Sequence, residues 1–309
     1  MPDEAELDQL RCAARSLASE ERHAGTASTV PAFLLFEHNG PWGVQAWRDA
    51  PFPDGLGRRV ESACRRARLR GLLVRRHRAR PGLPAHPQVT IACCAADGGQ
   101  AASTRLERAE DAERLPLGEL VTELRAGRTP AGWRPVGSLF LVCTHGRHDA
   151  CCAERGRPVA RALAREAPEA TWEVSHIGGD RFAANVVVLP TGLYYGRVPP
   201  GRARELVAAH EDNRLVPDLL RGRTSYSFPV QAAEIALRQR LGVDALDDAT
   251  LLSAHSNGSR TATTWRAAGA THQLVVEVSD RVPQRRLTCR AAQASAPPAY
   301  HCTGPTPAD

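Results

Sequence analysis

The sequence predicts an α/β protein with a central mixed sheet flanked by helices. Short apolar runs typical of buried strands alternate with stretches in which apolar residues recur at helical spacing. The 309 residues are 42% hydrophobic, which is enough for a sizeable core and for two domains of ordinary size. No apolar run approaches the roughly 20 residues needed to cross a bilayer.

The first part of the chain alternates helices and strands. Helices are predicted over residues 4–21 and 56–71, where apolar side chains fall on one face. Four strand-like runs accompany them, and the second is expected to pair with the first: 32–40, 43–47, 72–76 and 89–94. The polar, proline-punctuated segment 95–135 is expected to hold one helix within 111–127, and a domain boundary is placed near 130.

The second part has a sharper pattern. A buried strand at 138–143 precedes a helix at 154–168, with Pro158 expected in its first turn, and a strand at 171–176. A hairpin turning at Thr191-Gly192 and a helix at 201–212 complete the series. The order strand, helix, strand, hairpin, helix is the thioredoxin-like arrangement.

The remaining residues extend this unit. A helix is predicted at 230–242, two antiparallel strands at 261–269 and 272–280, and a frayed end after about residue 290. We therefore divide the chain into three regions, the first of which can be interpreted as a degenerate thioredoxin-like half: 1–130, 131–215 and 216–309.

Charge and composition narrow the function classes. The net charge is +6 and every basic residue is Arg, which is typical of a GC-rich bacterial genome rather than of a nucleic-acid-binding surface. Aromatic residues make up only 5% of the chain, so platforms for base stacking are scarce. The N-terminus lacks the layout of a secretory signal, so we expect a cytoplasmic protein.

The nine cysteines are not expected to form disulfides in a reducing cytoplasm, which favours metal binding or redox chemistry for those that cluster. In LVCTHGRHDACC, residues 141–152, Cys143 ends a predicted strand and Cys152 follows after eight residues. His176 ends the next strand, and the ends of neighbouring strands meet in a thioredoxin-like sheet. Thiolates and imidazole are ligands for zinc or for an iron–sulfur cluster.

The other thiols and imidazoles have simpler interpretations. Cys151 is interpreted as a packing residue or a neighbour of the ligands, and His145 and His148 as solvated loop residues. Cys93 and Cys94 end a strand and suit the core. No spacing pattern connects the remaining four cysteines: Cys12, Cys64, Cys289 and Cys302.

Three motifs in combination resemble the sucrase/ferredoxin-like family: Cys-x8-Cys, then Ser-His-x-Gly-Gly, then a hairpin ending in Tyr-Gly-Arg. The resemblance covers about residues 30–240 and is densest over 138–212. It implies a thioredoxin-like ferredoxin domain that binds a 2Fe-2S cluster through two Cys and two His. Residue by residue, it assigns Cys143, Cys152 and His176 as ligands.

The fourth position of the family pattern, a second His in His-x3-His, falls on Asp180. A carboxylate is a harder ligand for iron than imidazole or thiolate. Three explanations stay open. Asp180 is the ligand, a substitute comes from Cys151, His145 or His148, or this chain has lost the cluster.

The resulting hypothesis is an electron carrier, rather than a catalyst, that works between a reductase and an acceptor of unknown identity. A zinc-binding interaction module with the same ligands and a thiol oxidoreductase are the alternatives. The second alternative is weakened because the sequence has no Cys-x-x-Cys. Sucrose hydrolysis is not expected, since no defensible pair of carboxylates is present.

Overall fold

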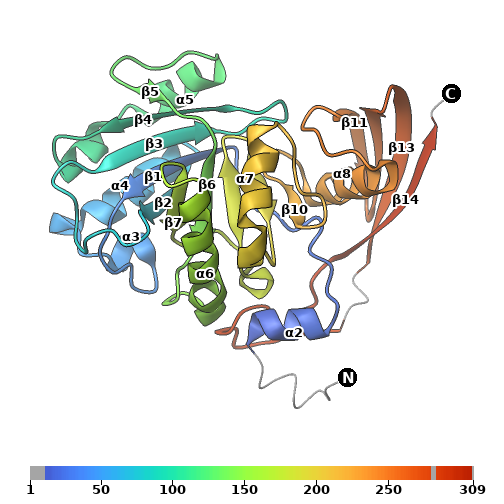
Figure 1. Ribbon diagram of the computed structural model, residues 1–309, viewed down its shortest axis with the longest axis horizontal. Coiled ribbons are helices and arrows are strands. Elements are labelled where there is room, and N and C mark those ends of the chain that lie inside the picture. The colour runs from blue at the N-terminus through green and yellow to red at the C-terminus, as the bar shows by residue number, and fades with distance from the viewer. Residues whose placement is uncertain (1–10, 280–282, 308–309) are drawn as a thin grey trace.

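A computed structural model describes residues 11–279 and 283–307 of the chain. It contains two sheets, of which the larger is mixed, with helices on its faces (Figure 1). The strand order of the large sheet is β10-β9-β8-β6-β7-β2-β1-β3-β4-β5, and that of the small sheet is β11-β12-β13-β14. The α/β fold class predicted from the sequence is confirmed.

The strands of the large sheet are, in chain order, β1 (Ala32–Glu37), β2 (Arg70–Arg75), β3 (Gln88–Cys93), β4 (Gln100–Arg105), β5 (Arg134–Pro135), β6 (Leu139–Cys143), β7 (Thr171–Val174), β8 (Val186–Leu189), β9 (Leu193–Tyr195) and β10 (Leu220–Arg223). Those of the small sheet are β11 (Ala249–Asn257), β12 (Arg260–Ala267), β13 (Ala270–Ser279) and β14 (Ala299–Pro307). The α-helices are α2 (Cys12–Ala18), α3 (Ala46–Asp49), α4 (Leu56–Arg66), α5 (Leu117–Arg125), α6 (Ala150–Glu166), α7 (Ala203–Glu211) and α8 (Phe228–Leu241). Short 3-10 turns are η1 (Pro53–Gly55), η2 (Ala109–Arg114), η3 (Asp180–Phe182) and η4 (Pro200–Arg202).

The large sheet contains one strand arrangement twice. In what we call the first half, β1 pairs parallel with β2 and antiparallel with β3, which pairs antiparallel with β4. In the second half, β6, β7, β8 and β9 repeat these relationships. The halves meet where β2 and β7 pair antiparallel, with Val74 opposite Val174. This seam relates the two halves by an approximate two-fold axis.

Each half has helices packed against its strands. In the second half, Val159 and Leu163 of α6 and Leu206 of α7 share one buried cluster with Phe140 of β6 and Val188 of β8. Figure 1 shows α6 and α7 side by side over this part of the sheet. This core holds α6 against β6, and the site described below lies where β6 ends and α6 begins.

Helix α6 begins one turn earlier than the sequence predicted. Asp149 caps it, since its side chain accepts a hydrogen bond from the backbone N–H of Cys151. Pro158 consequently lies inside the helix and not in its first turn, so that prediction was wrong. Gly156 allows close packing, because a Cβ there would lie 2.1 Å from the carbonyl oxygen of Cys143.

Two other predictions were also wrong. Residues 43–47 were expected to form a strand, but the Asp49 carboxylate accepts hydrogen bonds from the N–H groups of Val44 and Gln45, and α3 follows. The segment after residue 290 is not frayed as far as residue 307, because β14 pairs with β13. The part of the predicted first helix over 4–10 lies outside the described residues.

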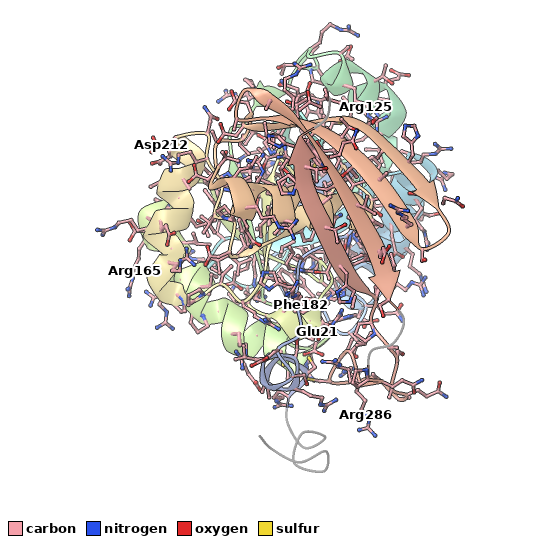
Figure 2. All side chains as sticks on the ribbon, turned by 90° about the vertical axis from the view of Figure 1, so that its right-hand side faces the viewer. Glu21, Arg125, Arg165, Phe182, Asp212 and Arg286 are labelled. Carbon is pink, nitrogen blue, oxygen red and sulfur yellow. The ribbon has the colours of Figure 1, made fainter. Side chains whose placement is uncertain are left out.

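The small sheet and α8 form one end of the molecule. Trp265 of β12 and Leu237 of α8 share a buried cluster there. Figure 2 views this sheet from outside and shows Glu21, Phe182 and Arg286 towards one end of the molecule, with Arg125 at the other. Among the helices of residues 11–279 and 283–307, none combines the length and the apolar character needed to cross a membrane.

Candidate metal centre

Two strand ends and one helix start bring Cys143, Cys152 and His176 together. Cys143 is the last residue of β6 and lies opposite Val174 of β7, two residues before His176. Cys152 lies in the first turn of α6. The two sulfur atoms and a ring nitrogen of His176 lie within 4.8 Å of one another, and both cysteines are fully buried.

Asp180 lies beside this group. Its Oδ1 is 3.0 Å from Nδ1 of His176 and accepts a hydrogen bond from the Cys152 thiol at 3.2 Å. The carboxylate side chain is 2% exposed, so it is buried against its partners. His148 stacks on His176 with a ring-centroid distance of 3.7 Å, and its Nε2 is 4.0 Å from Asp180 Oδ2. His148, His176 and Asp180 therefore form an overlapping group of potential ligands.

His145 and Cys151 are directed elsewhere. His145 Nε2 lies 2.9 Å from the carbonyl oxygen of Gly43, and its Nδ1 accepts the backbone N–H of His176 at 3.2 Å. With both ring nitrogens occupied, His145, in the loop between β6 and α6, connects the turn after β7 to the first half and offers no free donor. Cys151 Sγ contacts Cys12 and Cys289 instead of Cys143.

The charges in this group depend on one another. The Cys152 thiol, followed by His176, holds the pKa of Cys143 well below its usual value, although burial opposes this. Burial also disfavours a charged His176, but Asp180 and Cys143 outweigh it and raise its pKa to about 9. Burial disfavours a charged Asp180, yet His176 and then Cys152 hold its pKa below the ordinary value. The arrangement thus favours a thiolate, an imidazolium and a carboxylate side by side.

A buried arginine fixes the turn that carries His176 and Asp180. Arg221 donates hydrogen bonds to the carbonyl of Gly178 at 3.0 Å and to Asn185 Oδ1 at 2.8 Å. Gly179 has a φ of +80°, and a Cβ there would lie 2.3 Å from the Arg221 guanidinium. The space beside Gly179 is therefore filled by the Arg221 side chain.

The site reaches solvent through the first half. A cavity of about 460 Å³ has His148 and His176 on one side and the first-half residues Val44, Arg48 and Arg65 on the other. The His176 side chain is 25% exposed, unlike the buried thiols. His176 and the stacked His148, whose side chain is 35% exposed, are thus the potential ligands that reach solvent.

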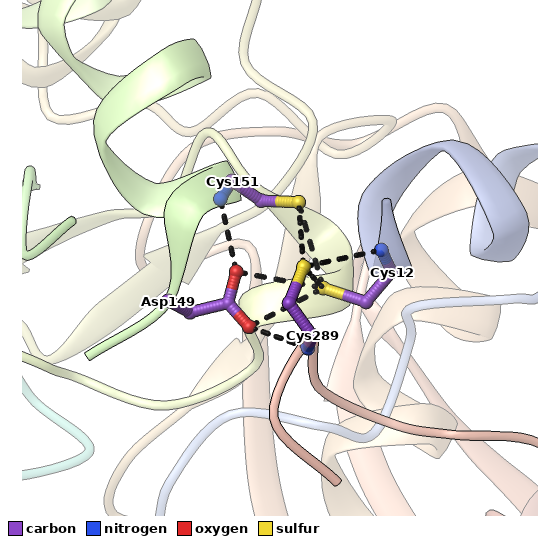
Figure 3. A group of neighbouring side chains, drawn as sticks. All are labelled: Cys12, Asp149, Cys151 and Cys289. Carbon is purple, nitrogen blue, oxygen red and sulfur yellow. Dashed lines mark hydrogen bonds between the residues drawn. The ribbon is translucent and has the colours of Figure 1, made fainter. Parts of the chain in front are cut away.

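A second group of potential ligands was not anticipated from the sequence. Cys12, Asp149, Cys151 and Cys289 place one sulfur or carboxylate oxygen each within 4.8 Å of the others (Figure 3). Cys12 and Cys289 were thought to have no pattern, and Cys151 was interpreted as packing. These cysteines are 138 to 277 residues apart, so no local spacing could have revealed the group.

Comparison with known proteins gives a family and a few structural neighbours. Residues 23–222 match the model of the sucrase/ferredoxin-like family. No curated protein matches this chain. A thioredoxin-like [2Fe-2S] ferredoxin from Aquifex aeolicus is similar at 22% identity and a TM-score of 0.25, over 27% of this chain and 89% of that one. A cysteine-to-serine variant of that ferredoxin has 23% identity, a TM-score of 0.25 and coverage of 27% and 96%.

Proposed function

The chain belongs to the sucrase/ferredoxin-like family, and on that premise we propose that it is an electron-transfer protein that binds a 2Fe-2S cluster through Cys143, Cys152, His176 and Asp180. The observation that carries the proposal is the meeting of two buried thiols and an imidazole at the ends of β6 and β7 and the start of α6. Such a cluster accepts and releases single electrons.

The donor set suits an iron–sulfur cluster. Two thiols that are fully buried, one of them with a lowered pKa, offer soft ligands without competition from water. Nδ1 of His176 is buried and lies 3.0 Å from Asp180 Oδ1, with which it forms an ion pair. Once it has lost its proton, this ring nitrogen can bind a metal.

Asp180 is the proposed fourth ligand, and His148 is its substitute. Asp180 is adjacent to both Cys152 and His176, whereas His148 contacts His176 by stacking and lies 4.0 Å from Asp180. Of the three loop substitutes considered from the sequence, His148 is the one within the ligand group, since Cys151 and His145 have other partners. His176 lies at the edge of the group and can exchange a proton with water.

A zinc-binding module and a thiol oxidoreductase remain the competing functions for the same residues. The test is purification without oxygen, followed by iron and sulfide assays and electron paramagnetic resonance after reduction. We expect about two irons and two sulfides per chain and a signal from a reduced 2Fe-2S centre. Zinc without sulfide would support the zinc module, and thiol-dependent activity that survives removal of metal would support the oxidoreductase.

Single substitutions then assign the ligands. Cys143→Ala, Cys152→Ala and His176→Ala should each abolish iron binding. Comparing Asp180→Asn with His148→Asn identifies the fourth ligand, since the one that ligates should lose iron and the other should keep it. Iron content that is unchanged in the cysteine variants would refute the proposed site.

The proposal implies a reductase as electron donor and an acceptor of unknown identity, in a reducing compartment such as the cytoplasm. The cavity beside His148 and His176 is the place where a donor or acceptor could approach the cluster most closely. Reduction of the purified protein by a candidate reductase, followed by optical bleaching, tests this step.

A further inference from the structure

The second cysteine group, which the proposed function does not use, has the geometry of a binding site for one metal ion. The three sulfur atoms of Cys12, Cys151 and Cys289 form a triangle with sides of 3.6, 3.5 and 3.5 Å (Figure 3). Asp149 completes the group, with its carboxylate oxygens 3.6 and 3.7 Å from Cys12 Sγ. Cys12 and Cys151 are fully buried and Cys289 is half-buried.

These separations match a tetrahedral ion. Zinc–sulfur bonds of about 2.3 Å at tetrahedral angles place neighbouring sulfurs about 3.8 Å apart. With a zinc–oxygen bond of about 2.0 Å, the sulfur-to-oxygen separation becomes about 3.5 Å. In a bridged cluster, thiolates on different irons lie farther apart than thiolates on one ion. Three sulfurs in mutual contact therefore suit a mononuclear ion.

We propose that Cys12, Cys151, Cys289 and Asp149 bind one Zn²⁺ ion as a structural site. Three soft thiolates with one carboxylate favour zinc over magnesium or calcium, which require oxygen ligands. The four protein ligands leave no open position, which is typical of structural rather than catalytic zinc. This site is separate from the iron–sulfur site in its ligands, and it goes beyond the proposed function.

Backbone groups orient the carboxylate. The N–H of Cys151 donates to Asp149 Oδ1 at 2.9 Å, and the N–H of Cys289 donates to Oδ2 at 2.7 Å. Such outer hydrogen bonds hold metal-binding side chains in place. Asp149 therefore caps α6 and faces the three sulfurs at the same time.

The site joins three distant segments of the chain. Cys12 begins α2, Cys151 lies in the first turn of α6, and Cys289 lies in the segment before β14. Figure 1 shows this late segment running beside α2, away from the small sheet. Bound zinc would join both of these segments to the start of α6. Cys152, a proposed ligand of the iron–sulfur cluster, directly follows Cys151 in this helix.

The test counts zinc in protein kept reduced with a phosphine and washed free of loosely bound metal. We expect about one zinc per chain. Cys12→Ser and Cys289→Ser should lower it at least tenfold, whereas Cys302→Ser, another half-buried cysteine near the end of the chain, should retain it. Cys143→Ser should lose iron and sulfide but keep zinc, which separates this site from the first. Zinc retained in both Cys12→Ser and Cys289→Ser, or a disulfide among these residues in the reduced protein, would overturn the proposal.

A measurement on the unsubstituted protein removes dependence on how well the variants fold. Cobalt exchanged for zinc should give strong thiolate-to-cobalt absorption and the intense visible bands of a tetrahedral ion. The weak bands of octahedral cobalt, with no charge-transfer absorption, would contradict a three-thiolate site.

Discussion

The two halves of the large sheet share their strand order but differ in what lies at the strand ends. Glu37 ends β1 and is opposite Val74, which is opposite Val174 across the seam, and Val174 is opposite Cys143. The approximate two-fold axis therefore relates Glu37 to Cys143. One half has a carboxylate where the other has a proposed ligand thiol.

The strand ends of the first half support the second half instead of forming a site. Glu37 accepts the N–H of Gln88 at 3.1 Å within its own half. Arg75 donates to Glu173 of β7 at 2.9 Å, and Arg76 donates to the carbonyl of Glu169 at 2.7 Å. The two halves thus share a backbone arrangement but carry different side chains at the strand ends. The first half, which has Glu37 at the position related to Cys143, contacts and supports the second half.

The largest expected difference between the halves is in iron content. Cys152 in α6 and Cys64 in α4 are matched, because each is 1% exposed and lies in the helix that connects the two parallel strands of its half. Cys152→Ser should reduce bound iron to below about a tenth, since a serine hydroxyl is a poor cluster ligand. Cys64→Ser should keep its iron and lose only about 1–2 kcal/mol of stability. Equal iron in both variants, measured after anaerobic purification, would remove the distinction between the halves.

Glycine substitutions compare how each half packs. A Cβ on Gly156 would lie 2.1 Å from the carbonyl oxygen of Cys143, and one on Gly57 would lie 2.0 Å from that of Trp47. Gly156→Ala and Gly57→Ala should each cost about 3 kcal/mol in free energy of unfolding, because a helix must move from its neighbour. Only Gly156→Ala should also reduce iron occupancy. Denaturant melts with iron assays on the same samples measure both effects, and normal iron in Gly156→Ala would contradict the role given to this contact.

The loss of stability at acid pH should distinguish His210, which has a structural role, from the histidines of the candidate site. Burial lowers the pKa of His210 from 6.5 to about 4, and its Nε2 lies 2.9 Å from the Tyr195 hydroxyl. On acidification, His210 takes up a proton near pH 6.5 in the unfolded chain but only near pH 4 in the folded one. The stability that the buried neutral His210 contributes is therefore complete above pH 6.5 and is lost as pH falls towards 4. The size of this contribution is about 3 kcal/mol. His210→Gln should flatten the stability profile over this window without changing iron content. A profile as steep as that of the unsubstituted protein would contradict the assignment.

The smallest expected effect is on the redox potential. Asp180→His replaces a negative ligand with a neutral one, which makes the site less negative and should raise the midpoint potential by on the order of 100 mV. Glu37→Gln also removes one negative charge, but at the first-half position related to Cys143, and should leave the potential nearly unchanged. Redox titration of both variants gives the answer, and a lowered potential in Asp180→His would show that the charge argument is wrong.

The sequence was most informative where periodicity and local spacing operate. The strands around Cys143 and His176, the hairpin at Thr191-Gly192 and helix α7 were all predicted, because buried strands and amphipathic helices leave a clear apolar pattern. Strand β4, with the sequence QAASTR, was missed, since Thr104 is its single β-branched residue and it has no aromatic residue to mark a strand. The strand-like appearance of residues 43–47 was overridden by the Asp49 side chain.

The candidate site likewise could be predicted only where it depends on local spacing and strand order. The convergence of Cys143, Cys152 and His176 follows from the order of neighbouring strands, so it could be anticipated. The grouping of Cys12 with Cys151 and Cys289 could not, because it depends on where the first and last segments of the chain return to the domain. The stacking of His148 on His176 likewise depends on a loop conformation that no periodicity describes.

The antiparallel seam between β2 and β7 has a consequence for how the amino-acid sequence of this protein can evolve. Two identical subunits joined in this way would carry every substitution twice, at both related positions. Because both halves lie on one chain, a replacement at Glu37 leaves Cys143 untouched. Each half is therefore free to change independently of the other.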